Sequence, residues 1–237
     1  MIKVIALTIF YASCNDYVSM ALVTFRDSEK KIVVGKILCL GRNYVAHAKE
    51  MNSETPEAPV VFLKPSTAIL HDGGRVVIPP FSAELHHEVE MVVLIGMQAK
   101  SVPRDHALDY VSGYAVGLDM TLRDVQAEAK KKGLPWSVAK GFDTSAPISR
   151  FVEKSKIREP HHLDISLKVN DNVRQQSNTS KMIFSIGEMI SYISSIFTLE
   201  AGDLIFTGTP EGVGQVGPGD RLEAELESVG TLRVSVQ

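Results

Sequence analysis

Three acidic residues lie beside apolar runs in the first half of this sequence. Glu88 and Glu90 flank Val89 in the segment HHEVEMVVLIG, and Asp119 follows the apolar run Tyr114–Leu118. On a β-strand, side chains two residues apart point the same way, so the two glutamates would share a face. Carboxylates beside hydrophobic strands are costly unless a cation compensates their charge, and all-oxygen ligands favour Mg²⁺ or Mn²⁺ over zinc. The pattern predicts a site for Mg²⁺ (or Mn²⁺); the alternative is a solvated face of an amphipathic strand.

A histidine and a glutamate form the second group that could do chemistry. His47 and Glu50 fall within an expected helix, Val45–Met51, which follows the strand-breaking segment Gly41–Tyr44. Their spacing of three puts both on one face of the helix. A carboxylate beside an imidazole orients the ring and raises its basicity, which suits activation of a water molecule. The alternative is an exposed polar helix without a catalytic role.

Further polar side chains border apolar segments and could meet an anionic substrate. Lys64 ends the strand-like run in PVVFLKP, and Lys140 lies in SVAKGF. Arg123 and Gln126 are three apart on the helix expected after Asp119, so both can face the acidic residues. Each of these side chains is also typical of a solvated surface position when it is taken alone.

The Gly-rich segment 208–219 has only a superficial likeness to a phosphate-binding loop. It lacks the Lys-Ser/Thr of a Walker motif, and no helix is expected after it. Its backbone N–H groups and the Thr209 hydroxyl could still hold a carboxylate. The paired histidines at 86–87 and 161–162 have no partners at zinc-ligand spacing, which disfavours a zinc hydrolase.

Length and composition limit the classes of protein to which the chain can belong. Its 237 residues suit one large domain or one domain with an appendage, and a hydrophobic content of 44% can build a substantial core. A net charge of −3 argues against a nucleic-acid partner. No apolar run reaches the roughly 18 residues that a membrane span needs, so no membrane association is expected.

The N-terminus gives weaker indications. The apolar start has one basic residue and no clean cleavage site, so a signal peptide is disfavoured, and Met20 is a possible alternative initiation site. Cys14 and Cys39 lack metal-ligand spacing. We expect reduced thiols in a cytoplasmic protein, with a disulfide between the two as the alternative.

Apolar runs and turn residues predict a β-rich α+β protein rather than a doubly wound dinucleotide-binding fold. Most apolar runs read as short strands, with one hairpin turning at Asn170–Asn172 and another closing the chain. Helices are expected at Val45–Met51, Val102–Tyr110, Thr121–Lys132 and Lys181–Phe197.

Seven motifs occur in the order seen in the fumarylacetoacetate hydrolase superfamily. They are RNYVAHAKEM, VVFLKPSTAIL, HHEVEMVVLIG, GLDMTLRDVQ, GLPWSVAKGFD, MIFSIGEMISYIS and LEAGDLIFTGTPEGVG, and they run from about Lys36 to the C-terminus. The chain most resembles the small acylpyruvase and oxaloacetate decarboxylase branch. The resemblance implies a mixed β-sandwich roll with a few peripheral helices and a short lid helix, usually as a homodimer. It implies a catalytic domain at 34–237 and leaves 1–33 as an N-terminal extension of short β segments.

The resemblance also implies roles for residues. Glu88, Glu90 and Asp119 resemble the family's Mg²⁺ ligands, in agreement with the strand pattern. The residues that resemble its catalytic groups are His47, Glu50 and Lys140, with His47 and Glu50 on the lid helix. The residues that resemble its substrate-binding groups are Arg42, Lys64, Arg123, Gln126 and Thr209.

The function implied by this resemblance is metal-dependent chemistry on a small 2-oxo acid. One outcome is hydrolysis of the carbon–carbon bond of an acylpyruvate or fumarylpyruvate, and another is decarboxylation of oxaloacetate, both through a metal-stabilised pyruvate enolate. The alternatives are an oxaloacetate keto–enol tautomerase and a 2-hydroxyhepta-2,4-diene-1,7-dioate isomerase. A non-catalytic binding protein on the same fold is a further alternative, which the presence of every expected metal ligand and dyad residue disfavours.

Overall fold

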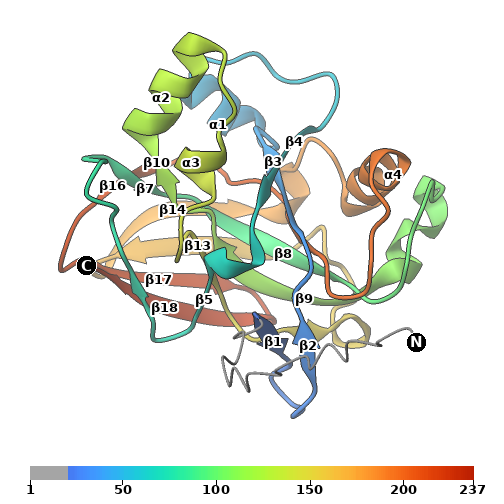
Figure 1. Ribbon diagram of the computed structural model, residues 1–237. Helices are drawn as coiled ribbons and strands as arrows, with labels where there is room; N and C mark the ends of the chain where they lie inside the picture. The colour runs from blue at the N-terminus through green and yellow to red at the C-terminus, as the bar shows by residue number, and fades with distance from the viewer. Residues whose placement is uncertain (1–20) are drawn as a thin grey trace, which may run out of the picture.

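The computed structural model describes residues 21–237, and the predictions concerning Met20, Cys14 and a signal peptide lie outside these residues. Short strands dominate this part of the chain (Figure 1). They are β1 (Leu22–Thr24), β2 (Lys31–Val33), β3 (Ile37–Gly41), β4 (Val60–Lys64), β5 (Ile69–His71), β6 (Arg75–Val76), β7 (Leu85–His87), β8 (Val89–Ile95), β9 (Val111–Leu118), β10 (Thr121–Leu122), β11 (Ala146–Ile148), β12 (Val152–Glu153), β13 (Asp164–Val169), β14 (Asn172–Asn178), β15 (Leu204–Phe206), β16 (Gly214–Val216), β17 (Arg221–Leu226) and β18 (Gly230–Val236).

Helices are few and short in the described residues. The α-helices are α1 (Val45–Glu50), α2 (Arg123–Lys132), α3 (Ser137–Lys140) and α4 (Ile186–Ile196). The 3₁₀ helices are η1 (Ser66–Ala68), η2 (Arg104–Tyr110), η3 (Lys154–Lys156) and η4 (Thr179–Lys181). The predicted helix Val45–Met51 is confirmed as α1, with Met51 as its C-terminal cap.

The helix expected over Thr121–Lys132 begins two residues later, at Arg123. Thr121 instead pairs with His86 in the antiparallel contact between β10 and β7. The predicted stop at Gly133 is confirmed, because this residue has a φ of 66°, a left-handed conformation that glycine adopts without a Cβ clash. Because Thr121 pairs with a distant strand, it does not cap the helix as predicted.

Two other helix boundaries also differ from the sequence prediction. The helix expected over Lys181–Phe197 begins at Ile186, because Ser185 and Glu188 form a reciprocal capping box that starts it there. The segment Val102–Tyr110 forms the tighter 3₁₀ helix η2 instead of an α-helix, and η2 packs against α4.

An eight-stranded mixed sheet forms the centre of the molecule, in the order β4-β3-β15-β8-β9-β11-β5, with β12 pairing on β9. Its middle strand β8 is buried along its whole length. Met91 and Val93 belong to one core cluster, and Val92 and Leu94 belong to the other. Because side chains alternate along a strand, the two clusters cover opposite faces of this sheet.

A five-stranded sheet, in the order β14-β13-β17-β18-β6, lies against the first of these clusters. Its strands contribute alternate apolar side chains such as Leu167, Ala224 and Leu232 to the same core. The predicted hairpin between β13 and β14 is confirmed, with Asn170 and Asp171 at φ values of 49° and 68°. Two sheets enclosing one core, with helices at the periphery, confirm the predicted β-rich sandwich roll.

Glu88 does not lie within a strand, and the prediction that it shares one strand with Glu90 is wrong. The chain leaves β7 at His87 and enters β8 at Val89, so Glu88 forms the junction between them. β7 belongs to the three-stranded sheet β10-β7-β16, whereas β8 belongs to the eight-stranded sheet. Glu88 therefore lies at the transition from one sheet to the other, whereas Glu90 lies inside β8.

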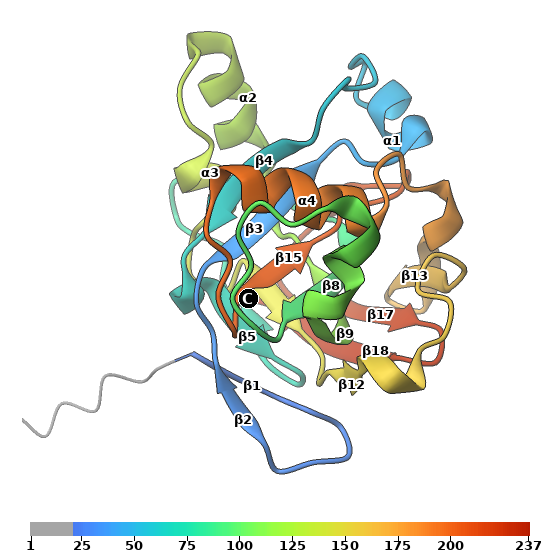
Figure 2. The ribbon, with the colours of Figure 1, turned by 90° about the vertical axis from the view of Figure 1, so that its right-hand side faces the viewer.

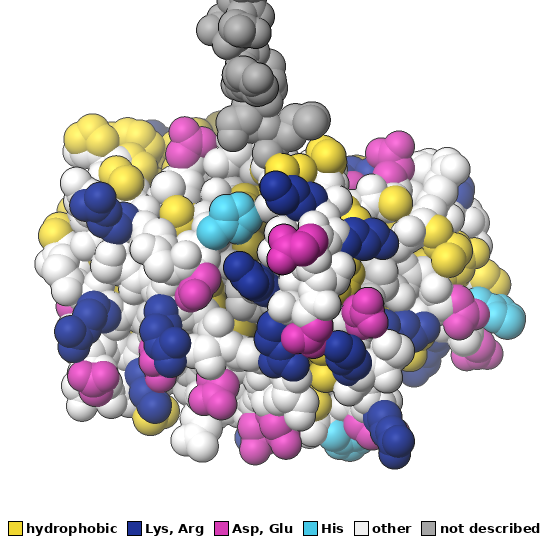
Figure 3. All heavy atoms as spheres, turned by 90° about the horizontal axis from the view of Figure 1, so that it is seen from below, with side chains coloured by type: hydrophobic (Ala, Val, Ile, Leu, Met, Phe, Trp, Pro, Cys, Tyr) yellow, Lys and Arg dark blue, Asp and Glu magenta, His cyan; other side chains and the backbone are white. Residues whose placement is uncertain are grey.

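The helices α1, α2 and α3 gather at one end of the sheets (Figures 1 and 2). Figure 2 shows α4 crossing over β3 and β15, and the β1–β2 hairpin extending from the opposite end. On that opposite face, acidic and basic side chains are interspersed (Figure 3). Among the described residues, no helix combines the length and the apolar character required to cross a bilayer.

Asn43 joins the segment before α1 to the central sheet. Its side-chain amide donates to the carbonyls of Thr207 at 2.7 Å and Phe184 at 3.2 Å, and its Oδ1 accepts from the Phe184 N–H at 2.8 Å. Asn43 is fully buried, so these groups have no access to water. It thus joins the end of β3 to the end of β15 and to the segment before α4.

We predict that Asn43→Ala lowers the free energy of unfolding by about 2–4 kcal/mol, because it leaves several buried backbone groups without a partner. Urea unfolding followed by circular dichroism measures this change. Asn172→Ala is the matched control, because Asn172 is exposed and bonds only the neighbouring Asn170 carbonyl; it should change stability by less than about 0.5 kcal/mol. Equal losses in both variants would contradict the anchoring role.

Candidate metal centre and active site

The three predicted metal ligands converge in space. One carboxylate oxygen each from Glu88, Glu90 and Asp119 lies within 4.8 Å of the others, and all three residues are at most 5% exposed. Glu90 lies in β8, and Asp119 follows the neighbouring strand β9. The Asp119 N–H donates to the Glu88 carbonyl at 2.8 Å, which ties the two segments together. Three buried carboxylate oxygens are a donor set that fits a hard divalent cation.

Two lysines and one arginine contact these carboxylates. Lys140 Nζ donates to Glu88 Oε2 and Asp119 Oδ2, each at 2.7 Å, and to Thr121 Oγ1 at 2.6 Å. Arg123 donates to Glu88 Oε1 at 2.5 Å. Glu90 has no cationic partner among the residues that the structure describes, and its carboxylate accepts a hydrogen bond from the Gly208 N–H at 2.7 Å.

The charges of the cluster shift its acids in opposite directions. Burial raises the pKa of Glu90 well above its usual range, and the Asp119 and Glu88 carboxylates raise it further. Burial also disfavours ionised Glu88, but the Lys140 and Arg123 cations outweigh burial and hold the pKa of Glu88 below its usual range. Glu90 is therefore the carboxylate whose negative charge most needs a further cation.

Lys64 is placed differently from the sequence expectation. Its ammonium donates to the backbone carbonyls of Lys140, Met120 and Ser145, and forms an ion pair with Asp119 Oδ1 at 2.8 Å. It is 2% exposed and is absent from the described lining of the cavity beside the acids. The geometry gives Lys64 the role of holding Asp119 in place, instead of the predicted contact with substrate.

A cavity of about 280 Å³ opens beside the acids, at the end of the molecule that carries α1, α2 and α3. Of the predicted site residues, the described lining contains His47, Arg42, Arg123, Gln126, Lys140 and Thr209 together with the three acids. A volume of this size suits a small organic acid. The fold thus brings together predicted site residues that lie as much as 167 positions apart in the sequence, from Arg42 to Thr209.

The His47–Glu50 pair is formed on α1. His47 Nδ1 lies 3.2 Å from Glu50 Oε2, and Glu50 Oε1 accepts from the Gly212 N–H at 3.0 Å. Glu50 therefore connects the helix to the Gly-rich loop while it holds the imidazole. With Nδ1 facing the carboxylate, the other ring nitrogen of His47 remains to handle a proton at the cavity.

Arg42 lies at the turn between β3 and α1 with a φ of 60°, which is unusual for a residue with a side chain. Its guanidinium lines the cavity, and its Nε is buried without a hydrogen-bond partner among the described residues. A strained backbone and an unpaired buried donor therefore occur together at one residue of the cavity lining, and a buried donor without a partner requires an explanation.

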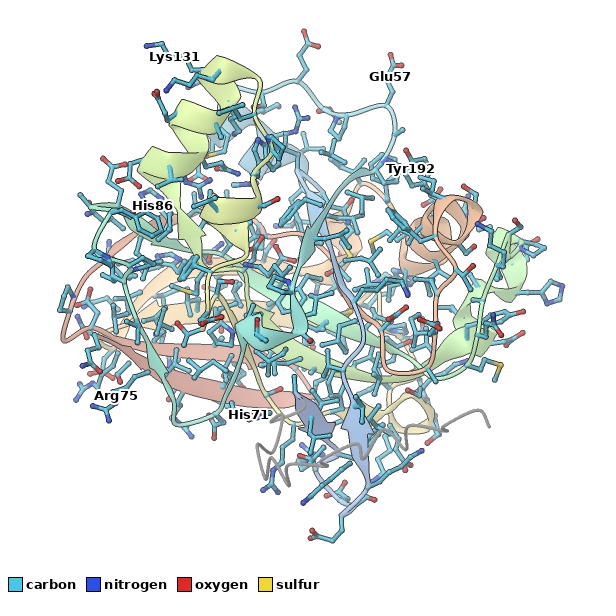
Figure 4. The ribbon with its side chains drawn as sticks, in the orientation of Figure 1. Glu57, His71, Arg75, His86, Lys131 and Tyr192 are labelled. Atoms are coloured by element: carbon cyan, nitrogen blue, oxygen red, sulfur yellow. The ribbon has the colours of Figure 1, made fainter. Side chains whose placement is uncertain are left out.

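Arg123 and His86 form a further contact beneath α2. Arg123 Nε donates to His86 Nδ1 at 3.4 Å, and Arg123 also donates to Gln126 Oε1 at 2.7 Å. Burial, aided by the Arg123 cation, lowers the pKa of His86 to about 4, so the ring is a neutral acceptor. Figure 4 shows His86 below α2, whereas Lys131 points away from the molecule.

Sequence reasoning missed the aromatic wall of the cavity. Phe62 and Trp136 meet edge to face with ring centroids 5.8 Å apart. Lys130 Nζ lies 5.3 Å from the Trp136 ring, and Lys140 Nζ lies 5.0 Å from the Phe62 ring. The motif GLPWSVAKGFD already placed the single tryptophan near Lys140, and this proximity was the available signal.

Comparisons with known proteins identify the family of this chain. The family model described as "Fumarylacetoacetate (FAA) hydrolase C-terminal" matches residues 36–237. The chain belongs to the fumarylacetoacetate hydrolase family. It is 55% identical over 201 residues to the rat protein named "Oxaloacetate tautomerase FAHD1, mitochondrial", which covers 85% of this chain and 91% of the relative.

Solved structures of this family are also similar. A Pseudomonas aeruginosa fumarylpyruvate hydrolase in complex with Mn²⁺ and pyruvate has a TM-score of 0.89 and 40% identity, over 92% of this chain and 95% of that one. A 2-hydroxyhepta-2,4-diene-1,7-dioate isomerase from Mycobacterium marinum has a TM-score of 0.77 and 36% identity, over 86% and 75%. The family of this chain therefore includes proteins named as hydrolases, isomerases and tautomerases.

We predict that saturating Mg²⁺ raises the melting temperature of the wild-type protein by about 5–10 °C, as expected for a ligand at about a hundred times its dissociation constant. Glu90→Gln should abolish this shift, because the amide keeps the shape but not the charge. Thermal unfolding with and without Mg²⁺ measures both. Glu84→Gln, at an exposed position, is the control and should keep the full shift. A full Mg²⁺ shift in Glu90→Gln would contradict the assigned site.

Proposed function

We propose that this protein is a Mg²⁺- or Mn²⁺-dependent enzyme that cleaves the carbon–carbon bond of acylpyruvates or decarboxylates oxaloacetate. The observation that carries the proposal is the shared cavity, which joins a buried carboxylate triad to the His47–Glu50 pair and to Lys140. Glu88, Glu90 and Asp119 would hold the metal. When bound, the metal would supply Lewis-acid polarisation of the carboxylate and 2-oxo groups of the substrate.

The remaining residues of the cavity divide the other tasks. His47 accepts the proton of a water molecule whose oxygen attacks the distal carbonyl carbon of an acylpyruvate, and Glu50 steadies the imidazolium that forms. Lys140 neutralises the oxyanion that develops on that carbonyl. The bond between this carbon and C3 then breaks, its electron pair stays with the pyruvate fragment, and C3 finally takes the proton from His47.

The substrate carboxylate needs cationic and hydrogen-bonding groups that are not occupied by the triad. Arg42, Gln126 and Thr209 line the cavity and suit this task, and we propose that they bind the oxo acid. Arg123 divides its hydrogen bonds between Glu88 and Gln126, so it both positions a metal ligand and orients the amide beside the substrate.

A second candidate function is oxaloacetate keto–enol tautomerisation, which the 55% identity to the rat tautomerase favours. It uses the same cavity and a single proton-handling group, because the C3–H bond breaks and an O–H bond forms at the 2-oxygen while no carbon–carbon bond breaks. A substrate panel with Mg²⁺ distinguishes the two. Acetylpyruvate and fumarylpyruvate report cleavage, oxaloacetate reports pyruvate release, and the ultraviolet absorbance of enol-oxaloacetate reports tautomerisation. If cleavage and decarboxylation are absent while tautomerisation is fast, the first proposal is contradicted.

We predict that His47→Ala lowers acylpyruvate hydrolysis by about 100-fold or more, because only hydrolysis must activate water. Decarboxylation of oxaloacetate should fall less than about tenfold. Steady-state rates on both substrates measure the difference. Lys49→Ala, an exposed change on the same helix, should leave both rates unchanged. Equal losses in the two reactions after His47→Ala would contradict the water-activating role.

We also propose that the protein forms a homodimer. β4 is an edge strand of the large sheet, and the exposed apolar residues Leu63, Leu134, Val138 and Ile196 are 45–59% exposed. Leu63 and Leu134 line one surface groove beside β4. Exposed apolar groups of this kind mark interaction sites.

Light scattering should give a mass near twice 25.9 kDa for the wild-type protein. Leu63→Lys should shift it toward the monomer, since a buried charge disfavours the interface. Val173→Lys is the control, because Val173 is at least as exposed as Leu63 but lies on the five-stranded sheet. A monomeric wild-type protein would contradict the dimer.

A further inference from the structure

Gln175 is a buried residue outside the cavity that contacts one lining residue, Thr209, and the backbone between two others, Glu88 and Glu90. It lies on β14 of the five-stranded sheet and is 1% exposed. Its Oε1 accepts from the Val89 N–H and from His87 Nδ1, each at 3.0 Å. Its Nε2 donates to Thr209 Oγ1 at 2.8 Å and to the Pro210 carbonyl at 2.9 Å. One side-chain amide therefore makes four hydrogen bonds.

The orientation of this amide is fixed by its backbone partners. The Val89 N–H can only donate and the Pro210 carbonyl can only accept, so oxygen must face Val89 and nitrogen must face Pro210. The amide nitrogen then donates to Thr209, whose oxygen acts as the acceptor. The His87 ring must carry its proton on Nδ1 for the same reason.

This orientation determines what the Thr209 hydroxyl can do. Because its oxygen already accepts from Gln175, its proton is left to be donated, and no acceptor for it occurs among the described residues. Thr209 lines the cavity beside the acids. A hydroxyl whose proton is free at that place suits the carboxylate or 2-oxo oxygen of an oxo acid.

The same amide also joins the two segments that form the metal site. Val89 lies between Glu88 and Glu90, while Thr209 follows Gly208, whose N–H donates to Glu90. Gln175 therefore contacts both the acid segment and the Gly-rich loop from behind. It reaches neither the cavity nor a reacting atom.

We propose that Gln175 is a positioning residue that occupies one lone pair of the Thr209 hydroxyl and directs its proton toward the bound oxo acid. The proposal rests on the proposed function, since it assumes that the cavity binds such a ligand. It requires that changes at Gln175 act on ligand affinity through Thr209, and not through the metal or the fold.

The test is a double-mutant cycle read out by binding. The variants are Gln175→Met, Thr209→Val and the double variant, with Gln176→Met as the matched control because Gln176 is the exposed neighbour on the same strand. Calorimetry measures oxalate and pyruvate affinity in saturating Mg²⁺, and a separate titration measures Mg²⁺ affinity without either acid. We expect each single variant to weaken oxalate binding about tenfold or more, as for a hydrogen bond to a charged group. The double variant should bind oxalate no more weakly than either single variant.

The outcomes of this test separate the role of Gln175 from the proposed function of the cavity. Mg²⁺ affinity within about threefold of wild type in Gln175→Met, together with weakened oxalate binding, supports the positioning role, since a general structural defect would lower both. Oxalate binding unchanged in Gln175→Met, or losses that add in the double variant, overturns it. A wild-type protein that binds Mg²⁺ but neither oxalate nor pyruvate contradicts the proposed function itself, and the role of Gln175 falls with it.

A second variant keeps the test decisive if Gln175→Met does not fold. Gln175→Glu keeps the acceptor for Val89 and His87 but removes the donor to Thr209, so the hydroxyl would turn its proton toward the new carboxylate. It should weaken oxalate binding by a similar factor in a folded protein with intact Mg²⁺ binding. Wild-type oxalate affinity in Gln175→Glu overturns the proposal.

Discussion

Compensation of buried negative charge is the constraint on which this structure depends. Three carboxylates lie within 4.8 Å of one another and are almost fully buried, an arrangement that repulsion and desolvation would not tolerate alone. Lys64 and Lys140 contact Asp119, and Lys140 and Arg123 contact Glu88. Within residues 21–237, Glu90 is left with a single backbone donor. A divalent cation would supply the positive charge that Glu90 lacks.

The fold serves this cluster by bringing strand ends together. Asp119 leaves β9 where Glu88 joins β7 to β8, and Gly208 follows β15, the other neighbour of β8. Three adjacent strands of one sheet thus deliver the acids and the loop that faces them. The short helices then close the same end and add the imidazole and Lys140, while β4 and the residue before α3 supply the aromatic wall, Phe62 and Trp136.

The chemistry of the site was more predictable than its geometry. The acids at 88, 90 and 119 were found because carboxylates beside apolar runs are rare and need a reason. The strand that was to align Glu88 with Glu90 is interrupted, because β7 pairs with β10 and β16 in another sheet. Local patterns report burial, but they do not report which distant strand a segment joins. The same limitation misplaced the start of α2, where Thr121 pairs with His86.

Residues that act from behind the cavity were beyond the reach of sequence patterns. Lys64 was assigned to the substrate, yet three backbone carbonyls and Asp119 surround its ammonium. Gln175 lies in a hairpin whose sequence reads as an ordinary polar strand, and only the packing of the second sheet brings its amide to Val89 and Thr209. Such contacts depend on tertiary packing between segments 34–86 residues apart.

The most direct test of the central claim is anomalous diffraction from crystals grown with Mn²⁺ and pyruvate. We predict one strong manganese peak within bonding distance of carboxylate oxygens from Glu88, Glu90 and Asp119, with pyruvate in the cavity beside Thr209. A manganese peak bound by other residues, or pyruvate bound away from this triad, would contradict the account.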